Sequence, residues 1–157
     1  MQNNLVQGYF LDEISNTTIH KTAVIEEGAI IGDNVKIGAF CYIGKDVVIG
    51  NDCELKSHVV IEGRTKIGTG NKIFSFAVIG QEPQNLKYKG EESTIEIGNN
   101  NRIREHCTIH PGTIGDNMKT IIGSVNLLIS SFEKFLLFNP IKFKDSSLAV
   151  LASTSVA

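Results

Sequence analysis

The sequence lacks the features of membrane-spanning, secreted and nucleic-acid-binding proteins. It has no apolar run of about 18 residues and no basic start followed by an apolar segment, which argues against a transmembrane helix and a signal peptide. The net charge is −2 and charges of both signs are interspersed, so neither nucleic acid nor an anionic membrane is expected as the main partner. At 157 residues, a single domain is expected.

Cysteine is also scarce. Cys41, Cys53 and Cys107 each follow a large aliphatic residue by four positions, a spacing that other small residues of the chain share. We predict that all three are small buried hydrophobic residues, because a disulfide or metal site would need another spacing. This use of cysteine indicates a cytoplasmic protein.

What the sequence does have is a strict six-residue period. Helices repeat their apolar face about every 3.6 residues, and strands repeat theirs every 2. Because six is a multiple of two, short strands separated by corners keep every sixth side chain on the same face. Three such strands form one triangular coil, and stacked coils form a parallel β-helix. The periodic residues are Ile19, Ile25, Ile31, Ile37, Ile43, Ile49, Leu55, Ile61, Ile67, Ile73 and Ile79.

Two neighbouring positions repeat with the same period. Glycine often follows the aliphatic residue directly, where a tight corner tolerates little side chain. The residue four positions after the aliphatic residue is small or β-branched and is expected to face inward. The sequence therefore predicts an all-β fold, a hexapeptide-repeat solenoid, with inward residues that include Val35, Cys41, Val47, Cys53, Val59, Thr65, Asn71 and Ala77.

The period divides the chain into three parts. Residues 1–15 lack it and form a leader, which is disordered, covers the first edge, or precedes the start codon in use. Residues 16–128 form the β-helix, with a polar loop at 81–96 extruded in phase, because Ile79 and Ile97 are three hexapeptides apart. Residues 129–157 have neither glycine nor a hexapeptide pattern and are expected to be an unpatterned C-terminal tail.

Several segments resemble the bacterial UDP-N-acetylglucosamine O-acyltransferases of lipid A synthesis. The most specific are IGQEPQNLKYKGE at 79–91 and NNRIREHCTIHPGT at 100–113, and IHKTAVIEEGAIIG at 19–32, LKSHVVIEGRTKIG at 55–68 and IGSVNLL at 122–128 support them. The resemblance implies a left-handed β-helix and a homotrimer with active sites in clefts between subunits. It also implies transfer of a 3-hydroxyacyl chain from acyl carrier protein to the 3-hydroxyl of UDP-N-acetylglucosamine, without metal or cofactor.

The resemblance assigns substrate-binding positions to four residues. Lys87 falls on the family's loop lysine, which is implicated in holding the sugar nucleotide, and a cation on a loop suits phosphates. Gln84 matches the family pattern, and His110 matches a histidine near the substrate. Asn85 stands where the family usually has aspartate, so a charge is lost there.

The general base of the family falls in the tail of this chain. The family continues with a hexapeptide of the form I-A-H-D-C, whose histidine is the base, and two hexapeptides counted from Ile122 place that histidine at Leu136. Leucine accepts no proton, and losing general-base catalysis costs roughly 10² to 10⁴ in rate. We therefore expect a truncated member of the family, from a frameshift or a degraded gene, that is inactive alone.

Two other interpretations stay open from the sequence. The chain is a non-catalytic remnant that trimerises or binds sugar nucleotide, or it is another hexapeptide-repeat enzyme, such as a sugar N-acyltransferase. A solenoid carbonic anhydrase would instead use three histidines on adjacent faces to bind zinc. The remaining histidines, His20, His58 and His106, are expected at structural, exposed or interfacial positions.

Overall fold

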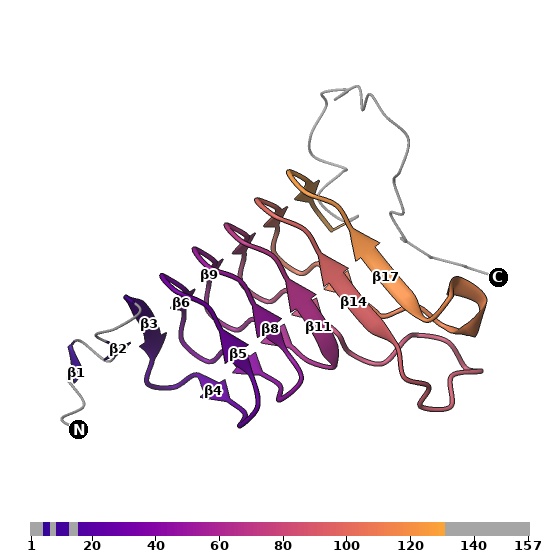
Figure 1. Cartoon of the computed structure of the whole chain (residues 1–157), viewed down its shortest axis with the longest axis horizontal. Coiled ribbons are helices and arrows are strands. Elements are labelled where there is room, and N and C mark those ends of the chain that lie inside the picture. Colours follow the sequence, from indigo (N-terminus) through magenta and orange to yellow (C-terminus); the bar gives the residue numbers. More distant parts are fainter. Residues whose placement is uncertain (1–4, 7–8, 13–15, 131–157) are drawn as a thin grey trace.

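A computed structural model describes residues 5–6, 9–12 and 16–130 of the chain. Short strands recur along the described residues and stack in chain order into a three-sided solenoid (Figure 1). None of the helices in this part of the chain could cross a membrane. Leu136 and the rest of the predicted tail from residue 131 lie outside the described residues.

Three sheets form the three sides of the solenoid, and we name them sheets A, B and C. Sheet A has the order β1-β2-β3-β6-β9-β12-β15-β18: Leu5–Val6, Tyr9–Asp12, Thr17–His20, Lys36–Ile37, Glu54–Leu55, Lys72–Ile73, Arg102–Ile103 and Leu127–Leu128. Sheet B has the order β16-β13-β10-β7-β4: Thr108–Ile109, Val78–Ile79, Val60–Ile61, Tyr42–Ile43 and Val24–Ile25. Sheet C has the order β17-β14-β11-β8-β5: Lys119–Ile122, Thr94–Ile97, Arg64–Ile67, Val48–Ile49 and Ile30–Ile31.

Strands of successive coils pair in parallel, so each periodic aliphatic residue lies beside its equivalent in the next coil. Ile37 pairs with Leu55, and Leu55 pairs with Ile73. The inward residues fill the solenoid, and their side chains are almost completely buried from Val35 to Ile103. The structure therefore confirms the predicted all-β, parallel β-helix fold.

Close contact between coils explains the glycines that follow the aliphatic residues. A methyl group added at Gly50 would lie 2.8 Å from both the carbonyl carbon and the carbonyl oxygen of Gly68 in the next coil. A side chain there would have to push the two coils apart, which would break the ladder of backbone hydrogen bonds on both sides of the corner.

Strands β1 and β2 extend sheet A at the start of the chain. Strand β2 pairs antiparallel with β3, with Phe10 opposite Ile19, and β1 pairs antiparallel with β2. The backbone of these strands covers the first edge of sheet A, which would otherwise present unpaired amide and carbonyl groups. The interpretation of residues 1–15 as a leader stays a prediction, and strands β1 and β2 lie within it.

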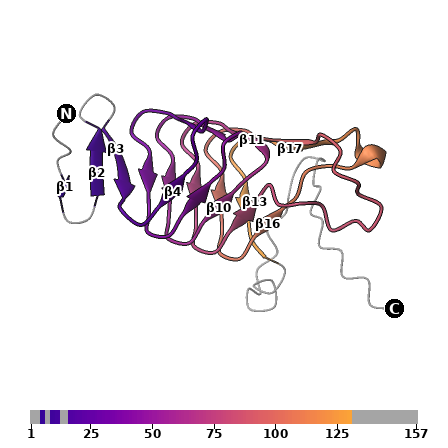
Figure 2. The same cartoon turned by 90° about the horizontal axis from the view of Figure 1, so that it is seen from below.

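Two excursions leave the solenoid at the corner between sheets B and C. The first follows β13 and ends at Ser93, because Thr94–Ile97 is already strand β14, so it is shorter than the predicted loop at 81–96. The second follows β16 and contains the 3-10 helix η1 at Ile114–Asp116. Both excursions lie at the same end of the solenoid (Figure 2).

The cysteines occupy the predicted inward positions. All three are buried, and the thiols of Cys41 and Cys53 donate to the carbonyl oxygens of Lys56 and Gly68. Burial raises the pKa of the Cys41 and Cys53 thiols, because the thiolate would lose its hydration. The prediction of small buried hydrophobic residues is confirmed.

One ion-pair cluster on sheet A makes stability depend on pH. The carboxylate of Glu54 contacts the ammonium groups of Lys56 and Lys72, which lower its pKa from 4.5 to about 2. Because the folded-state pKa is depressed, this stabilisation is present above pH 4.5 and is lost as the pH falls toward 2.

We expect the melting temperature of Glu54→Gln to fall less than that of the parent chain as the pH is lowered from 4.5 toward 2. Glu27→Gln, at an exposed glutamate, is the control, and equal falls for all three proteins would contradict the assignment.

Candidate functional site

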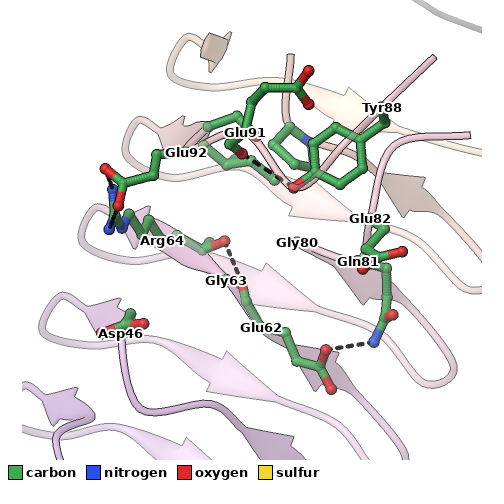
Figure 3. Close-up of a pocket in the computed structure, with 14 residues that line it drawn as sticks. Asp46, Glu62, Gly63, Arg64, Gly80, Gln81, Glu82, Tyr88, Glu91 and Glu92 are labelled. Atoms are coloured by element: carbon green, nitrogen blue, oxygen red, sulfur yellow. Dashed lines mark hydrogen bonds and ion pairs between the residues drawn. The ribbon is translucent and has the colours of Figure 1, made fainter. Parts of the chain in front are cut away.

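The first excursion is fastened to the solenoid at both of its ends. At its start, the side-chain amide of Gln81 donates to the carboxylate of Glu62 at 2.7 Å. Near its end, the guanidinium of Arg64 makes two hydrogen bonds, of 2.6 and 2.7 Å, to the carboxylate of Glu92 (Figure 3). Arg64 holds the pKa of Glu92 below its usual range, so this bidentate pair stays charged at neutral pH.

The tip of this excursion is a turn organised by Asn85. Its backbone amide donates to the carbonyl of Pro83 at 2.8 Å, its carbonyl accepts from the amide of Tyr88 at 2.9 Å, and its Oδ1 accepts from the amide of Lys87 at 3.0 Å. An asparagine side chain that accepts from the amide two residues later is a common way to stabilise a turn. Gln84, Asn85 and Lys87 all lie exposed on this tip.

His110 directly follows β16, at the start of the second excursion, and contacts the base of the first. Its Nδ1 is 2.9 Å from the carbonyl oxygen of Glu82 and 3.1 Å from that of Gln81. Carbonyl oxygens only accept, so Nδ1 carries the proton and donates. In the neutral ring Nε2 is then an acceptor, and this buried atom has no hydrogen-bond partner among the residues that the structure describes.

A cleft of about 390 Å³ opens beneath the excursion, between it and the corner of the solenoid. Most of the charged residues that line it are acidic: Asp46, Glu62, Glu82, Glu91 and Glu92, against the single cation Arg64 (Figure 3). The backbone amide of Lys89 lowers the pKa of Glu91, which favours the charged carboxylate. The carboxylates around the cleft repel a phosphate group. The lysines on the tip of the excursion are therefore better placed than the cleft to bind phosphate.

The structure does not bring the four predicted residues into one pocket. His110 contacts the base of the excursion, whereas Gln84, Asn85 and Lys87 lie on its tip, and none of the four lines the cleft. Sequence reasoning missed the Arg64–Glu92 pair and the Glu62–Gln81 contact, which join residues of different coils. Within the described residues, no group of three or more His, Cys, Asp or Glu side chains could hold a metal ion, so the zinc interpretation finds no support there.

Comparisons with known proteins match most of this chain. Residues 15–45 match the family model described as bacterial transferase hexapeptide (six repeats). Over 116 residues, the chain is 55% identical to the acyl-[acyl-carrier-protein]–UDP-N-acetylglucosamine O-acyltransferase of Rickettsia canadensis, covering 74% of this chain and 44% of that protein. Among solved structures, LpxA of Acinetobacter baumannii is 56% identical with a TM-score of 0.68, covering 69% of this chain and 42% of that one.

Over the residues that match, this chain is homologous to these O-acyltransferases. A more distant member, the UDP-N-acetylglucosamine acyltransferase of Campylobacter jejuni, is 41% identical with a TM-score of 0.64, covering 70% of this chain and 44% of that one. This chain therefore spans less than half the length of the O-acyltransferases that it matches. Their shared solenoid agrees with the resemblance seen in the sequence.

Proposed function

We propose that this protein acts in the reaction for which its relatives are named, the transfer of an acyl chain from acyl carrier protein to UDP-N-acetylglucosamine in lipid A synthesis. The observation that carries the proposal is 55% identity to a named O-acyltransferase over 116 residues, which is 74% of this chain. In this proposal, the chain supplies the part of the site that holds the sugar nucleotide, and it works as a cytoplasmic homotrimer.

The excursion offers two groups that suit a sugar nucleotide. Lys87 is exposed on the tip, and its ammonium can pair with a diphosphate from the direction of solvent. At the base, Nε2 of His110 is a buried acceptor that lacks a donor within the described part of the chain, and a sugar hydroxyl is a suitable donor. Both groups would act on binding and orientation of the sugar nucleotide.

Proton removal from the sugar hydroxyl is a separate task. The general-base position of the family falls at Leu136, beyond the described residues, and leucine cannot take a proton. We therefore propose that this chain alone binds UDP-N-acetylglucosamine without transferring an acyl group to it. Substantial acyl transfer by the purified chain would contradict this part of the proposal.

Binding is tested by calorimetric titration with UDP-N-acetylglucosamine. We expect Lys87→Ala to weaken the affinity by about 10- to 100-fold, since a charge-assisted hydrogen bond is worth about 1.5–3 kcal/mol. Lys89→Ala is the matched control, because this lysine is also exposed on the excursion, and its affinity should stay within about twofold of the parent. Equal losses for the two variants would refute the specific role of Lys87, and no saturable binding by the parent chain would refute the proposed function.

A further inference from the structure

We propose that Arg64 is a positioning residue for Lys87, and that its ion pair with Glu92 holds the tip of the first excursion in the conformation that binds a sugar nucleotide. The inference rests on the proposed function and adds a group that acts on Lys87 from another coil. Its evidence is a series of hydrogen bonds, which leads from the solenoid through the excursion to the backbone of Lys87.

The series begins on a well-paired strand of the solenoid. Arg64 is the first residue of β11 and lies opposite Thr94, the first residue of β14. Its guanidinium makes two hydrogen bonds to the carboxylate of Glu92, two residues before β14 begins (Figure 3). Two parallel hydrogen bonds fix the orientation of the carboxylate as well as its distance, which a single ammonium group does not do.

From Glu92 the series continues toward the tip through the preceding residue. The backbone carbonyl of Glu91 accepts from the hydroxyl of Tyr88 at 3.1 Å, and its carboxylate accepts from the amide of Lys89 at 2.9 Å. Both bonds span Gly90, which has a left-handed φ of 87°, and no described atom lies within 4 Å of the place where a Cβ would be. Since packing does not hold this glycine, the hydrogen bonds of Glu91 order the backbone around it.

The last steps reach the backbone of Lys87 from both sides. On one side, the amide of Tyr88 donates to the carbonyl of Asn85 at 2.9 Å. On the other, the amide of Asn85 donates to the carbonyl of Pro83 at 2.8 Å. The amide of Lys87 donates to Asn85 Oδ1 at 3.0 Å, whereas its ammonium is exposed and pairs with no carboxylate among the described residues. The backbone of Lys87 is therefore held, and its charge is left for a ligand.

Holding Lys87 in place before binding raises the affinity for the ligand. If a free loop adopts its binding conformation only part of the time, the measured affinity falls in proportion to that fraction. Without the Arg64–Glu92 pair, the excursion would be fastened by side chains only at its start, through Gln81 and its neighbours. We therefore expect weaker binding of UDP-N-acetylglucosamine although every group that contacts the ligand is still present.

A direct contact between Arg64 and the ligand predicts the opposite effect at Glu92. Arg64 lines the cleft, so its guanidinium would then bind the diphosphate itself. Glu92→Ala would release that guanidinium and remove a negative charge, and the affinity for UDP-N-acetylglucosamine would rise. If the pair positions Lys87, Glu92→Ala weakens the affinity instead. The sign of this change therefore separates positioning from direct contact.

Calorimetric titration with UDP-N-acetylglucosamine measures these effects. We expect Arg64→Ala and Glu92→Ala each to weaken the affinity about three- to tenfold. Lys66→Ala, at an exposed cation of the same strand, and Glu82→Ala, at an exposed carboxylate of the same cleft, are the matched controls and should stay within about twofold of the parent. In a Lys87→Ala background, Arg64→Ala should cause no further loss, because Arg64 acts through Lys87.

Hydrogen exchange of the excursion provides a readout without ligand. We expect the amides of Lys87 and Lys89 to exchange about threefold faster or more in Arg64→Ala and in Glu92→Ala, because loss of the pair lets the tip open more often. Exchanging the two charges in the double variant Arg64→Glu, Glu92→Arg should restore both slow exchange and affinity. Circular dichroism checks that each variant keeps the β-helix.

Three outcomes would overturn the inference: unchanged exchange in Arg64→Ala and Glu92→Ala, a higher affinity in Glu92→Ala, or a further loss of affinity when Arg64→Ala is added to Lys87→Ala. Absence of binding by the parent chain would refute the proposed function and with it the role of Arg64 in binding. Exchange that stays slow in the parent and fast in Arg64→Ala would still show that Arg64 orders the tip, so the two failures are distinguishable.

Discussion

Replacing Ile67 by aspartate is expected to abolish cooperative folding of the solenoid. The side chain of Ile67 is 1% exposed and lies in the middle of the stack, paired with Ile49 and Ile97. The change removes about 1.5–3 kcal/mol of apolar burial and adds the cost of burying a carboxyl group, which is several kcal/mol more. Domains of this size are stable by only about 5–15 kcal/mol, so little or no folded protein should remain.

The neighbouring residue provides the matched control. Lys66 precedes Ile67 on β11 but points to the exposed face of sheet C. Lys66→Asp places a carboxylate beside Glu96 of the next coil, so a loss of about 1 kcal/mol or less is expected. Urea denaturation followed by circular dichroism measures both variants. Similar midpoints for Ile67→Asp and Lys66→Asp would show that the inward face has been assigned incorrectly.

Asn71→Ala is expected to cost about 2–4 kcal/mol of stability, although it removes a polar residue from the core. Asn71 is 1% exposed, and its Oδ1 accepts from the buried amide of Asn101 at 2.9 Å. Its Nδ2 donates to the carbonyl oxygens of Gly68 and Gly98 at 2.9 and 2.8 Å, which links two coils. Alanine would leave a buried amide and two carbonyl groups without these partners, and each such loss costs about 1–3 kcal/mol where water cannot replace it.

Asn99→Ala is the control for this variant. Asn99 also links two coils, since its Oδ1 accepts from the amide of Thr69 at 2.8 Å, but it is exposed. Water can replace that hydrogen bond, so a loss below about 1 kcal/mol is expected. Thermal unfolding of both variants at one pH measures the difference. Equal losses would mean that burial does not determine the value of these inter-coil hydrogen bonds.

Some features of the fold were predictable from single positions. The spacing from Ile19 to Ile79 predicts strands, corners and an inward face, because each position of a solenoid has the same surroundings in every coil. The same rule predicts burial at Cys41, Cys53 and Asn71. It does not reveal why an asparagine is accepted at position 71, because its hydrogen-bond partners belong to other coils.

The candidate site was less predictable. The motif around Lys87 could be recognised from the sequence, and His110 lies against the base of the same excursion in the structure. Nothing in the spacing indicates that Arg64 pairs with Glu92 across 28 residues, or that the excursion ends before Thr94. These details depend on which corner of the solenoid the excursion leaves and on how far its side chains reach.

The sequence by itself determined the coil, the phase and the inward residues of this protein, because a six-residue period has one consistent solution when apolar side chains avoid water. Only the tertiary structure decided what lies on the outside. Stacking brings residues of successive coils about 4.8 Å apart, so the ring contacts among Phe40, His58, Phe76 and His106 and the ion pair of Glu54 with Lys72 exist only once the coils are assembled. The six-residue period does not restrict the residue type at outward positions. The contacts that an outward side chain makes depend on the side chains of neighbouring coils.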